Sequence, residues 1–362
     1  MNADEKVKIV ESVAEEIVTK DELRKLFEEK KHPVAYDGFE PSGLAHLPFG
    51  VFRPLILERL MKAGIHFKLY LGDWFAWINN KLSGDLDTIR KCGEYFVEVW
   101  HAAGVDLSKV EIVWASDLVA RKEYWQRVLT VAKHCTIART ERALTIMGRK
   151  KGELKEVAQY FYPMMQVADI FELGVDICQL GLDQRRANML ARDIAEKLKW
   201  RKPVAVSHHM LLGLTGMKEP EGFDENKKID AMIASKMSKS KPESSIFVHD
   251  SEGEIRKKIS KAYCPAKQVD GNPILEYTKY IIFPKFDKMK IERDKKYGGN
   301  LEVESYEELE NLFKRGELHP LDLKSAVASY LNEIIKPIRE HFEKNKRARE
   351  LYEIVKKARI TR

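Results

Sequence analysis

The sequence predicts an α/β protein with a parallel sheet, followed by a basic helical region. Short apolar segments typical of buried strands occupy residues 34–36 and 67–71, and a helical pattern over residues 52–63 separates them. A strand, helix, strand order is typical of a parallel sheet, because parallel neighbours need a long crossover connection. The remaining predicted elements continue this order, with strands at 110–114 and 204–206 and helices at 87–101 and 124–134.

Helical patterns flank the first predicted strand on both sides. Residues 4–29 are charged, with apolar residues at helical spacing, so we expect one or two helices within an N-terminal helical segment of residues 1–32. After the strand, Gly64 ends the helix at 52–63. Pro54 suits that helix only if the helix begins near Pro48 or Gly50, because proline is tolerated in first turns.

Composition indicates a large, soluble, cytoplasmic protein. The chain has 362 residues, of which 44% are hydrophobic, enough to bury a sizeable core and form two domains. The N-terminus lacks the apolar core of a signal peptide, and no apolar run approaches membrane-spanning length. The cysteines are far apart and form no Cys-x-x-Cys pair, so neither a zinc site nor a disulfide framework is indicated.

Positive charge is concentrated in the last third of the sequence. The net charge is +7, and residues 251–362 contain 25 Lys and Arg against 19 Asp and Glu. This region is predicted to be helical, and its basic excess is compatible with an RNA partner. The alternative is a solvated surface rich in Lys and Glu, with no nucleic-acid role.

A short loop at residues 235–242 carries the strongest chemical signal. Lysines and serines alternate in it around a single Met, and a Pro follows. Lysine ammonium groups supply mobile positive charge, and serine hydroxyls add neutral donors, so this composition suits phosphate. The residues expected to bind a nucleotide are Lys236, Met237, Ser238, Lys239 and Ser240.

The Lys-Met-Ser-Lys-Ser string at 236–240 resembles the second signature of class I aminoacyl-tRNA synthetases, and residues 36–50 resemble the region of the first signature. This likeness implies that Gly38 and His46 bind ATP, and that His46, Lys236 and Lys239 are catalytic. In place of the Gly and second His of that signature, this chain has Pro48 and Phe49. Pro is compatible with a first helical turn. The missing imidazole implies a larger role for the lysine loop.

A third stretch, residues 162–170, indicates the amino acid. If it is helical, Gln166 and Asp169 share a face with Tyr162, which presents a phenol, an amide and a carboxylate together. With residues 181–186, this stretch resembles tyrosyl-tRNA synthetases of the archaeal and eukaryotic type. The resemblance implies that Tyr36 and Asp169 bind the substrate phenol, and that Tyr162, Gln166 and Gln184 hold its α-amino group. The alternative is a solvated helix face.

The resemblance extends from residue 36 to residue 339 and implies the domain organisation. It implies a Rossmann-type catalytic domain (33–230), a connective insertion at about 91–159 that forms a homodimer interface, a loop and linker (231–250), and an α-helical anticodon-binding domain (251–362). By the same likeness, Arg142 and Arg185 contact the acceptor end of tRNA, whereas Tyr297 and Asp322 read an anticodon base. The alternatives are surface ion pairs for the arginines, a core tyrosine, and an Asp at a helix N-terminus.

The expected function is therefore that of a tyrosyl-tRNA synthetase. Its partners would be tRNA(Tyr), L-tyrosine and ATP, with Mg²⁺ arriving on ATP, no protein-bound metal and no membrane. Three alternatives remain open: a tryptophanyl enzyme, a non-catalytic RNA-binding paralogue suggested by Pro48 and Phe49, and a nucleotidyltransferase of related fold.

Overall fold

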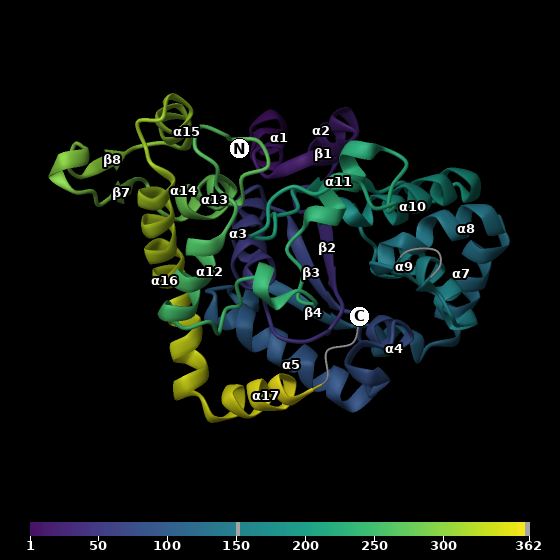
Figure 1. Cartoon of the computed structure of the whole chain (residues 1–362). Coiled ribbons are helices and arrows are strands. Elements are labelled where there is room, and N and C mark those ends of the chain that lie inside the picture. Colours follow the sequence, from purple (N-terminus) through teal and green to yellow (C-terminus); the bar gives the residue numbers. More distant parts are fainter. Residues whose placement is uncertain (150–152, 359–362) are drawn as a thin grey trace.

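A six-stranded sheet forms the centre of the computed structural model, which describes residues 1–149 and 153–358 (Figure 1). The strand order is β1-β6-β5-β2-β3-β4; every neighbouring pair is parallel except β1 and β6. The bounds are β1 Ala14–Val18, β2 Val34–Phe39, β3 His66–Leu71, β4 Val110–Trp114, β5 Ile177–Gly181 and β6 Val204–His208. The predicted α/β class with a parallel sheet is confirmed.

The direction of strand succession reverses at β2, and this positions the site. From β2 the chain proceeds to β3 and β4 on one side, and later to β5 and β6 on the other. In such sheets, ligands bind beyond the carboxyl ends of the strands at the point of reversal. Phe39 and Gly181, the last residues of β2 and β5, therefore mark the expected position of a ligand.

Two boundary predictions need correction. The N-terminal segment contains the predicted helices, α1 (Ala3–Glu11) and α2 (Lys20–Glu29), but β1 lies between them and joins the sheet beside β6. The expected insertion at 91–159 begins too early, because β4 pairs with β3 and belongs to the sheet. Strand β1 was missed because it forms only by pairing with the distant β6, whereas the strand at 110–114 was predicted but assigned to the insertion.

The helices cover both faces of the sheet and continue into the C-terminal region. Those of the first part are α3 Arg53–Lys62, α4 Asp73–Ile78, α5 Leu86–Ala102, α6 Ala115–Val119, α7 Lys122–Lys133, α8 Ile137–Ala143, α9 Phe161–Glu172, α10 Arg185–Leu198 and α11 Lys227–Ser235. The later ones are α12 Glu252–Lys261, α13 Pro273–Tyr277, α14 Phe283–Lys285, α15 Tyr306–Arg315, α16 Pro320–Lys344 and α17 Lys346–Lys357.

Alternating strand residues point into two separate apolar cores. Ala35 and Phe67 belong to one core, whereas Tyr36 and Tyr70 belong to the other. The first core continues without interruption into α12, α16 and α17, so the C-terminal helices pack on one face of the sheet domain. The second core contains residues of α7, α9 and α10 and borders the candidate site.

The first crossover helix starts with a wide turn. Residues Pro48–Phe52 form a π-helical turn that continues directly into α3, so the helix begins at Pro48, as Pro54 requires. A proline ring clashes with the carbonyl four residues earlier in a regular helix, and a wider turn relieves this clash. The same arrangement recurs at Thr278–Ile282, directly before α14 and its Pro284.

The C-terminal region is mainly helical, as predicted, but it also contains a hairpin. Strands β7 (Met289–Ile291) and β8 (Leu301–Val303) pair antiparallel and project from the body of the molecule (Figure 1). The long helix α16 runs along that side, and α17 turns back beneath the sheet domain against α5. Among the described residues, no helix is long and apolar enough to cross a membrane.

Candidate active site

A cavity of about 420 Å³ opens beyond the carboxyl ends of β2 and β5. Its walls are formed by residues of the second apolar core and by the lysine loop at 235–242. All the residues predicted to be catalytic or to bind tyrosine or ATP line it: Tyr36, Gly38, His46, Tyr162, Gln166, Asp169, Gln184, Lys236, Met237, Ser238, Lys239 and Ser240. The structure therefore brings together residues that lie up to about 200 positions apart in the sequence.

Three buried polar atoms without a hydrogen-bond partner among the described residues line one end of this cavity, which we call the tyrosine end: Tyr36 Oη, Tyr70 Oη and Asp169 Oδ2. Tyr36 lies on β2 and Asp169 on α9, and both are buried. Asp169 Oδ1 accepts a hydrogen bond from the Tyr124 hydroxyl at 2.8 Å. Among the described residues, Tyr36 Oη and Asp169 Oδ2 have no hydrogen-bond partner. Buried polar atoms are almost always paired, so the two atoms indicate a ligand group that both donates and accepts.

Burial dominates the protonation of this end of the cavity. It raises the pKa of Asp169 to about 8, although the hydrogen bond from Tyr124 acts in the opposite direction. Burial likewise holds the pKa of Tyr36 well above its usual range. Burial thus disfavours the ionised carboxylate, whereas a ligand group that donates to Asp169 Oδ2 favours it.

Amide and carboxylate groups form the adjoining wall. Gln166 Nε2 donates to Gln184 Oε1 at 3.2 Å, and Gln184 Nε2 donates to the Ile146 carbonyl at 3.0 Å. The Tyr162 hydroxyl donates to Glu40 Oε1 at 2.6 Å. This wall of the cavity therefore carries amide and carboxylate oxygens, a type of acceptor that suits an ammonium group. The helical spacing of Tyr162, Gln166 and Asp169 is confirmed, since all three lie in α9.

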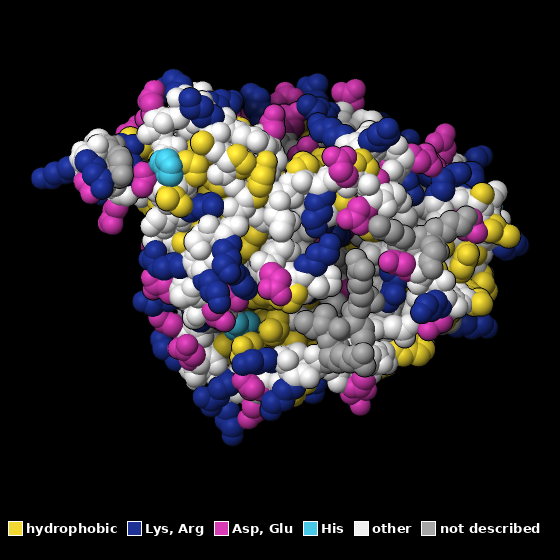
Figure 2. Space-filling view, viewed as in Figure 1, with side chains coloured by type: hydrophobic (Ala, Val, Ile, Leu, Met, Phe, Trp, Pro, Cys, Tyr) yellow, Lys and Arg dark blue, Asp and Glu magenta, His cyan; other side chains and the backbone are white. Residues whose placement is uncertain are grey.

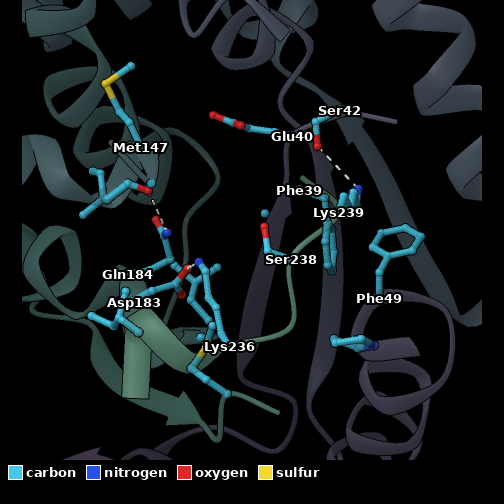
Figure 3. A pocket seen from close by; sticks show the side chains of 18 of the residues that line it. Phe39, Glu40, Ser42, Phe49, Met147, Asp183, Gln184, Lys236, Ser238 and Lys239 are labelled. Carbon is cyan, nitrogen blue, oxygen red and sulfur yellow. Dashed lines mark hydrogen bonds and ion pairs between the residues drawn. The ribbon is translucent and has the colours of Figure 1, made fainter. Parts of the chain in front are cut away.

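The two loop lysines point to opposite sides of the cavity (Figure 3). Lys236 Nζ lies 2.5 Å from Asp183 Oδ2, on the side of Gln184. Lys239 Nζ lies 3.4 Å from Ser42 Oγ, and 4.5 Å and 5.5 Å from the ring centroids of Phe96 and Phe49. We call this loop region the phosphate end. Its two cations are therefore held by different means, one by a carboxylate and the other by aromatic faces.

Burial also lowers the pKa of the basic groups at the phosphate end. The pKa of Lys239 falls to about 8 for this reason. His46 has its pKa well below its usual range, first because of burial and then because of the Lys239 and Lys236 charges. Its Nδ1 has no hydrogen-bond partner among the described residues. At neutral pH, His46 is thus a neutral imidazole and Lys239 is still mostly charged.

Backbone pairing brings the first signature next to the lysine loop. Leu47 N donates to the Ile246 carbonyl at 2.8 Å, and Val248 N donates to the Ala45 carbonyl at 3.0 Å. The loop itself is tied to the segment after β6, because Met237 N donates to the Leu211 carbonyl at 2.8 Å. These bonds fix His46 and Lys239 on the same wall.

The altered signature residue Phe49 packs in an aromatic cluster. Its ring centroid lies 4.1 Å from that of Phe96 and 5.2 Å from that of Phe39. This cluster forms the surface on which the Lys239 ammonium rests. The position that carries a second imidazole in the signature therefore contributes a ring face here. Pro48, the first residue of the π-helical turn, also lines the cavity.

An ionic cluster not anticipated from the sequence lies beneath the strand ends. Arg53 Nε donates to Asp37 Oδ2 at 2.7 Å, and Arg53 Nη1 lies 2.8 Å from His208 Nδ1. Burial raises the pKa of Asp37 to about 6 against the opposing charge of Arg53. The only sequence signal was an Asp at the end of a buried strand. Because its partners lie on α3 and β6, the cluster was not predictable from local pattern.

Comparison with known proteins agrees with this geometry. A family model described as "tRNA synthetases class I (W and Y)" matches residues 28–220 and 227–336. A tyrosine–tRNA ligase of Sulfurisphaera tokodaii is 48% identical over 95% of this chain and 94% of the relative. This chain belongs to the tyrosyl-tRNA synthetase family.

Two further relatives show how far the likeness extends. "Tyrosine–tRNA ligase 2, cytoplasmic" of Arabidopsis thaliana is 47% identical over 99% of this chain, which spans only 46% of that relative. A crystal structure of tyrosyl-tRNA synthetase complexed with L-tyrosine, from Pyrococcus horikoshii, has a TM-score of 0.88. It is 41% identical, and the match covers 98% of this chain and 100% of the other. The catalytic and C-terminal regions are therefore both typical of this family.

The predicted RNA-binding residues lie away from the cavity. Arg142 is exposed on α8, whereas the Arg185 Nε pairs with Glu16 of β1 at 2.8 Å. Asp322 lies in the first turn of α16, and the side chain of Tyr297 lies outside the described part. Arg293 links the loop after Tyr297 to the connection between α15 and α16, donating to the Gly299 carbonyl at 2.9 Å and to the Glu317 carbonyl at 3.0 Å. Lys and Arg side chains cluster around this projecting hairpin (Figure 2).

Several cavity residues were missed by sequence reasoning. Tyr70 and Tyr124 surround Asp169, and Glu40 and Asp183 accept from Tyr162 and Lys236. Glu40 and Asp183 lie within residues 36–50 and 181–186, which carry two of the sequence motifs. An acidic residue beside each motif could therefore have been recognised as a candidate site residue. Tyr124 lies 45 residues from Asp169 on another helix, and no local pattern connects the two.

Proposed function

We propose that this chain activates L-tyrosine with ATP and transfers the tyrosyl group to the 3′ end of tRNA(Tyr). One observation carries the amino-acid specificity: Tyr36 Oη and Asp169 Oδ2 are buried, unpaired and on the cavity wall. A phenol hydroxyl accepts from Tyr36 and donates to Asp169, which satisfies both atoms at once. A substrate that lacks the hydroxyl leaves both unpaired, which is the basis of strong rejection.

The chemistry requires no protein nucleophile. The tyrosine carboxylate attacks the α-phosphorus of ATP, a new P–O bond forms, and the bond to pyrophosphate breaks. Lys236 and Lys239 stabilise the negative charge on the phosphates, and neutral His46 donates a hydrogen bond. Holding the reactants in line supplies much of the remaining acceleration. Mg²⁺ arrives with ATP as part of the substrate.

In the second step, a ribose hydroxyl of the tRNA 3′ end attacks the tyrosyl carbonyl, and AMP leaves. Arg142, exposed on α8, is the arginine free to approach the acceptor end, since Arg185 is engaged with Glu16. The hairpin loop that carries Tyr297 and the first turn of α16 with Asp322 contact the anticodon. Arg293 supports this assignment, because it ties the hairpin loop to the connection that leads into α16.

We infer a homodimer whose interface lies in the connective region. Exposed apolar side chains lie at the end of this region, with Val157 80%, Tyr160 40% and Phe161 38% exposed, and on α4, where Trp77 is 44% exposed. Asn80 Nδ2 donates to Glu156 Oε2 at 2.8 Å and ties these segments together. A second copy would bury this apolar surface. We place the protein in the cytoplasm, because its four cysteines are all free.

The alternatives make different demands on the cavity. Tryptophan has an indole N–H that only donates, so Tyr36 Oη would stay unpaired. A nucleotidyltransferase acting on a small substrate has no use for the anticodon region. A non-catalytic paralogue would bind tRNA and form no adenylate.

Exchange of labelled pyrophosphate into ATP tests the proposal directly. The assay compares tyrosine, tryptophan and phenylalanine with the unmodified chain and with Asp169→Ala. We expect exchange with tyrosine alone, and its loss in the variant. Exchange driven by tryptophan would favour the tryptophanyl alternative. Folded protein that binds tRNA without any exchange would establish the paralogue instead.

A further inference from the structure

Three potential metal ligands converge where α5, α16 and α17 meet, far from the cavity. Glu98 and His101 lie one turn apart on α5, and His341 lies in the last turn of α16. One ligating atom from each residue lies within 4.8 Å of those of the other two. Glu98 Oε2 and His341 Nε2 are 2.8 Å apart, and the His101 and His341 ring centroids are 5.3 Å apart.

We propose that Glu98, His101 and His341 bind one divalent transition-metal ion of the zinc class. Two imidazoles and one carboxylate are a donor set that zinc favours, with water completing the coordination. Hard ions such as Mg²⁺ and Ca²⁺ prefer all-oxygen surroundings, so the imidazoles select against them. The proposal is independent of the synthetase reaction, because none of these residues lines the cavity.

The geometry needs only small movements to accept the ion. Zinc lies about 2.0–2.2 Å from nitrogen and oxygen ligands, which places ligand atoms roughly 3.4 Å apart in a tetrahedral site. His101 is exposed, so its ring is free to rotate toward the other two. Glu98 and His341 are 19% and 18% exposed, which limits their freedom but leaves a path for the ion. The Glu98 carboxylate offsets part of the ion's charge.

The site would join two parts of the fold. His341 belongs to the C-terminal helix α16, and Glu98 and His101 belong to a helix that packs on the central sheet. A bound ion therefore adds a link across this junction. An ion that binds only the folded state raises the free energy of unfolding by RT ln(1 + c/Kd), where c is the concentration of free ion, and so raises the thermal midpoint.

The test is equilibrium dialysis and calorimetric titration of the chelator-treated full chain with Zn²⁺ and Co²⁺. We expect one ion per chain with micromolar affinity at pH 7.5 and a higher melting temperature. His101→Ala and His341→Ala should each weaken binding at least tenfold. His101→Ala guards against misfolding, because its ring is exposed and the Glu98–His341 contact stays intact.

The matched control is His66→Ala. His66 is also an exposed histidine near a glutamate, with Nε2 4.0 Å from Glu111 Oε2, but among the described residues it belongs to no group of three potential metal ligands. Binding should be unchanged in this variant. Substoichiometric binding by the unmodified chain would overturn the proposal. Equal affinity in the unmodified chain and in both ligand variants would overturn it as well.

Discussion

The tyrosine end of the cavity rests on a strand and a helix, whereas the phosphate end rests largely on a loop. Tyr36 and Asp169 belong to β2 and α9 and are held among buried tyrosines. Lys236 and Lys239 belong to a turn that follows α11 and is fixed by a few backbone bonds. Amino-acid selection therefore depends on packed regular elements. The charge for the reaction comes from a loop outside them.

The largest effect is expected from a substitution at the phosphate end. Lys239→Ala removes a cation that acts mainly in the transition state, so adenylate formation should fall by about 10²–10³-fold with tyrosine affinity nearly unchanged. Single-turnover pyrophosphate exchange and tyrosine titration measure the two quantities. Lys257→Ala on α12, exposed and remote from the cavity, is the control. Equal losses in rate and in tyrosine affinity would rule out this role for Lys239.

The second largest effect is expected from a substitution at the tyrosine end. Asp169→Asn replaces a carboxylate oxygen, which accepts a hydrogen bond, by an amide NH₂ group, which cannot. A buried polar group left without a partner costs about 1–3 kcal/mol, so tyrosine affinity should fall roughly 10–100-fold. At saturating tyrosine, this variant should retain part of the rate of pyrophosphate exchange. Glu172→Gln, one turn further along α9 and paired with Arg127, is the matched control. An unchanged tyrosine KM in Asp169→Asn would contradict the assigned pocket.

A pH profile, recorded for the unmodified chain and for one variant at each end, distinguishes the two ends. Burial lowers the pKa of Lys239 to about 8, so its positive charge is present below that pH and is lost above it. We expect kcat/KM for ATP to fall about tenfold per unit above pH 8. Lys239→Arg keeps its charge and should move the fall to higher pH.

Asp169 titrates in the same range, with a pKa of about 8. The profile is therefore also recorded for Asp169→Asn at saturating tyrosine. If the fall in kcat/KM for ATP disappears in that variant, Asp169 and not Lys239 is its origin.

The smallest effect concerns the aromatic faces under Lys239. Phe49→Leu removes one of two ring contacts, and a partly desolvated cation–π interaction of about 1 kcal/mol corresponds to roughly fivefold in kcat/KM for ATP. A double-mutant cycle with Lys239→Ala shows whether Phe49 acts through the lysine. The Phe49→Leu effect should vanish in the Lys239→Ala background. Additive losses would mean that Phe49 affects packing only.

Sequence reasoning succeeded for elements with a local signature. The loop at 235–242 and the helix with Tyr162, Gln166 and Asp169 are short segments whose spacing fixes their chemistry, and the structure brings both to one cavity. Strand β5 was missed because a five-residue apolar run is compatible with a buried helix as well. Strand β1 was missed because its charged sequence becomes a strand only by pairing with β6.

The sequence by itself determined the chemical class of the site, because a phosphate loop and a helical recognition face are encoded within a few residues. Only the tertiary structure decided what surrounds them. Tyr124 beside Asp169, Phe96 beneath Lys239, and Glu98 opposite His341 are contacts across 45, about 140 and 243 residues. Burial by such distant neighbours shifts the pKa values of the site residues, because desolvation depends on the packed surroundings and not on the order of residues in the chain. The same packing leaves Tyr36 Oη and Asp169 Oδ2 able to bind a phenol hydroxyl.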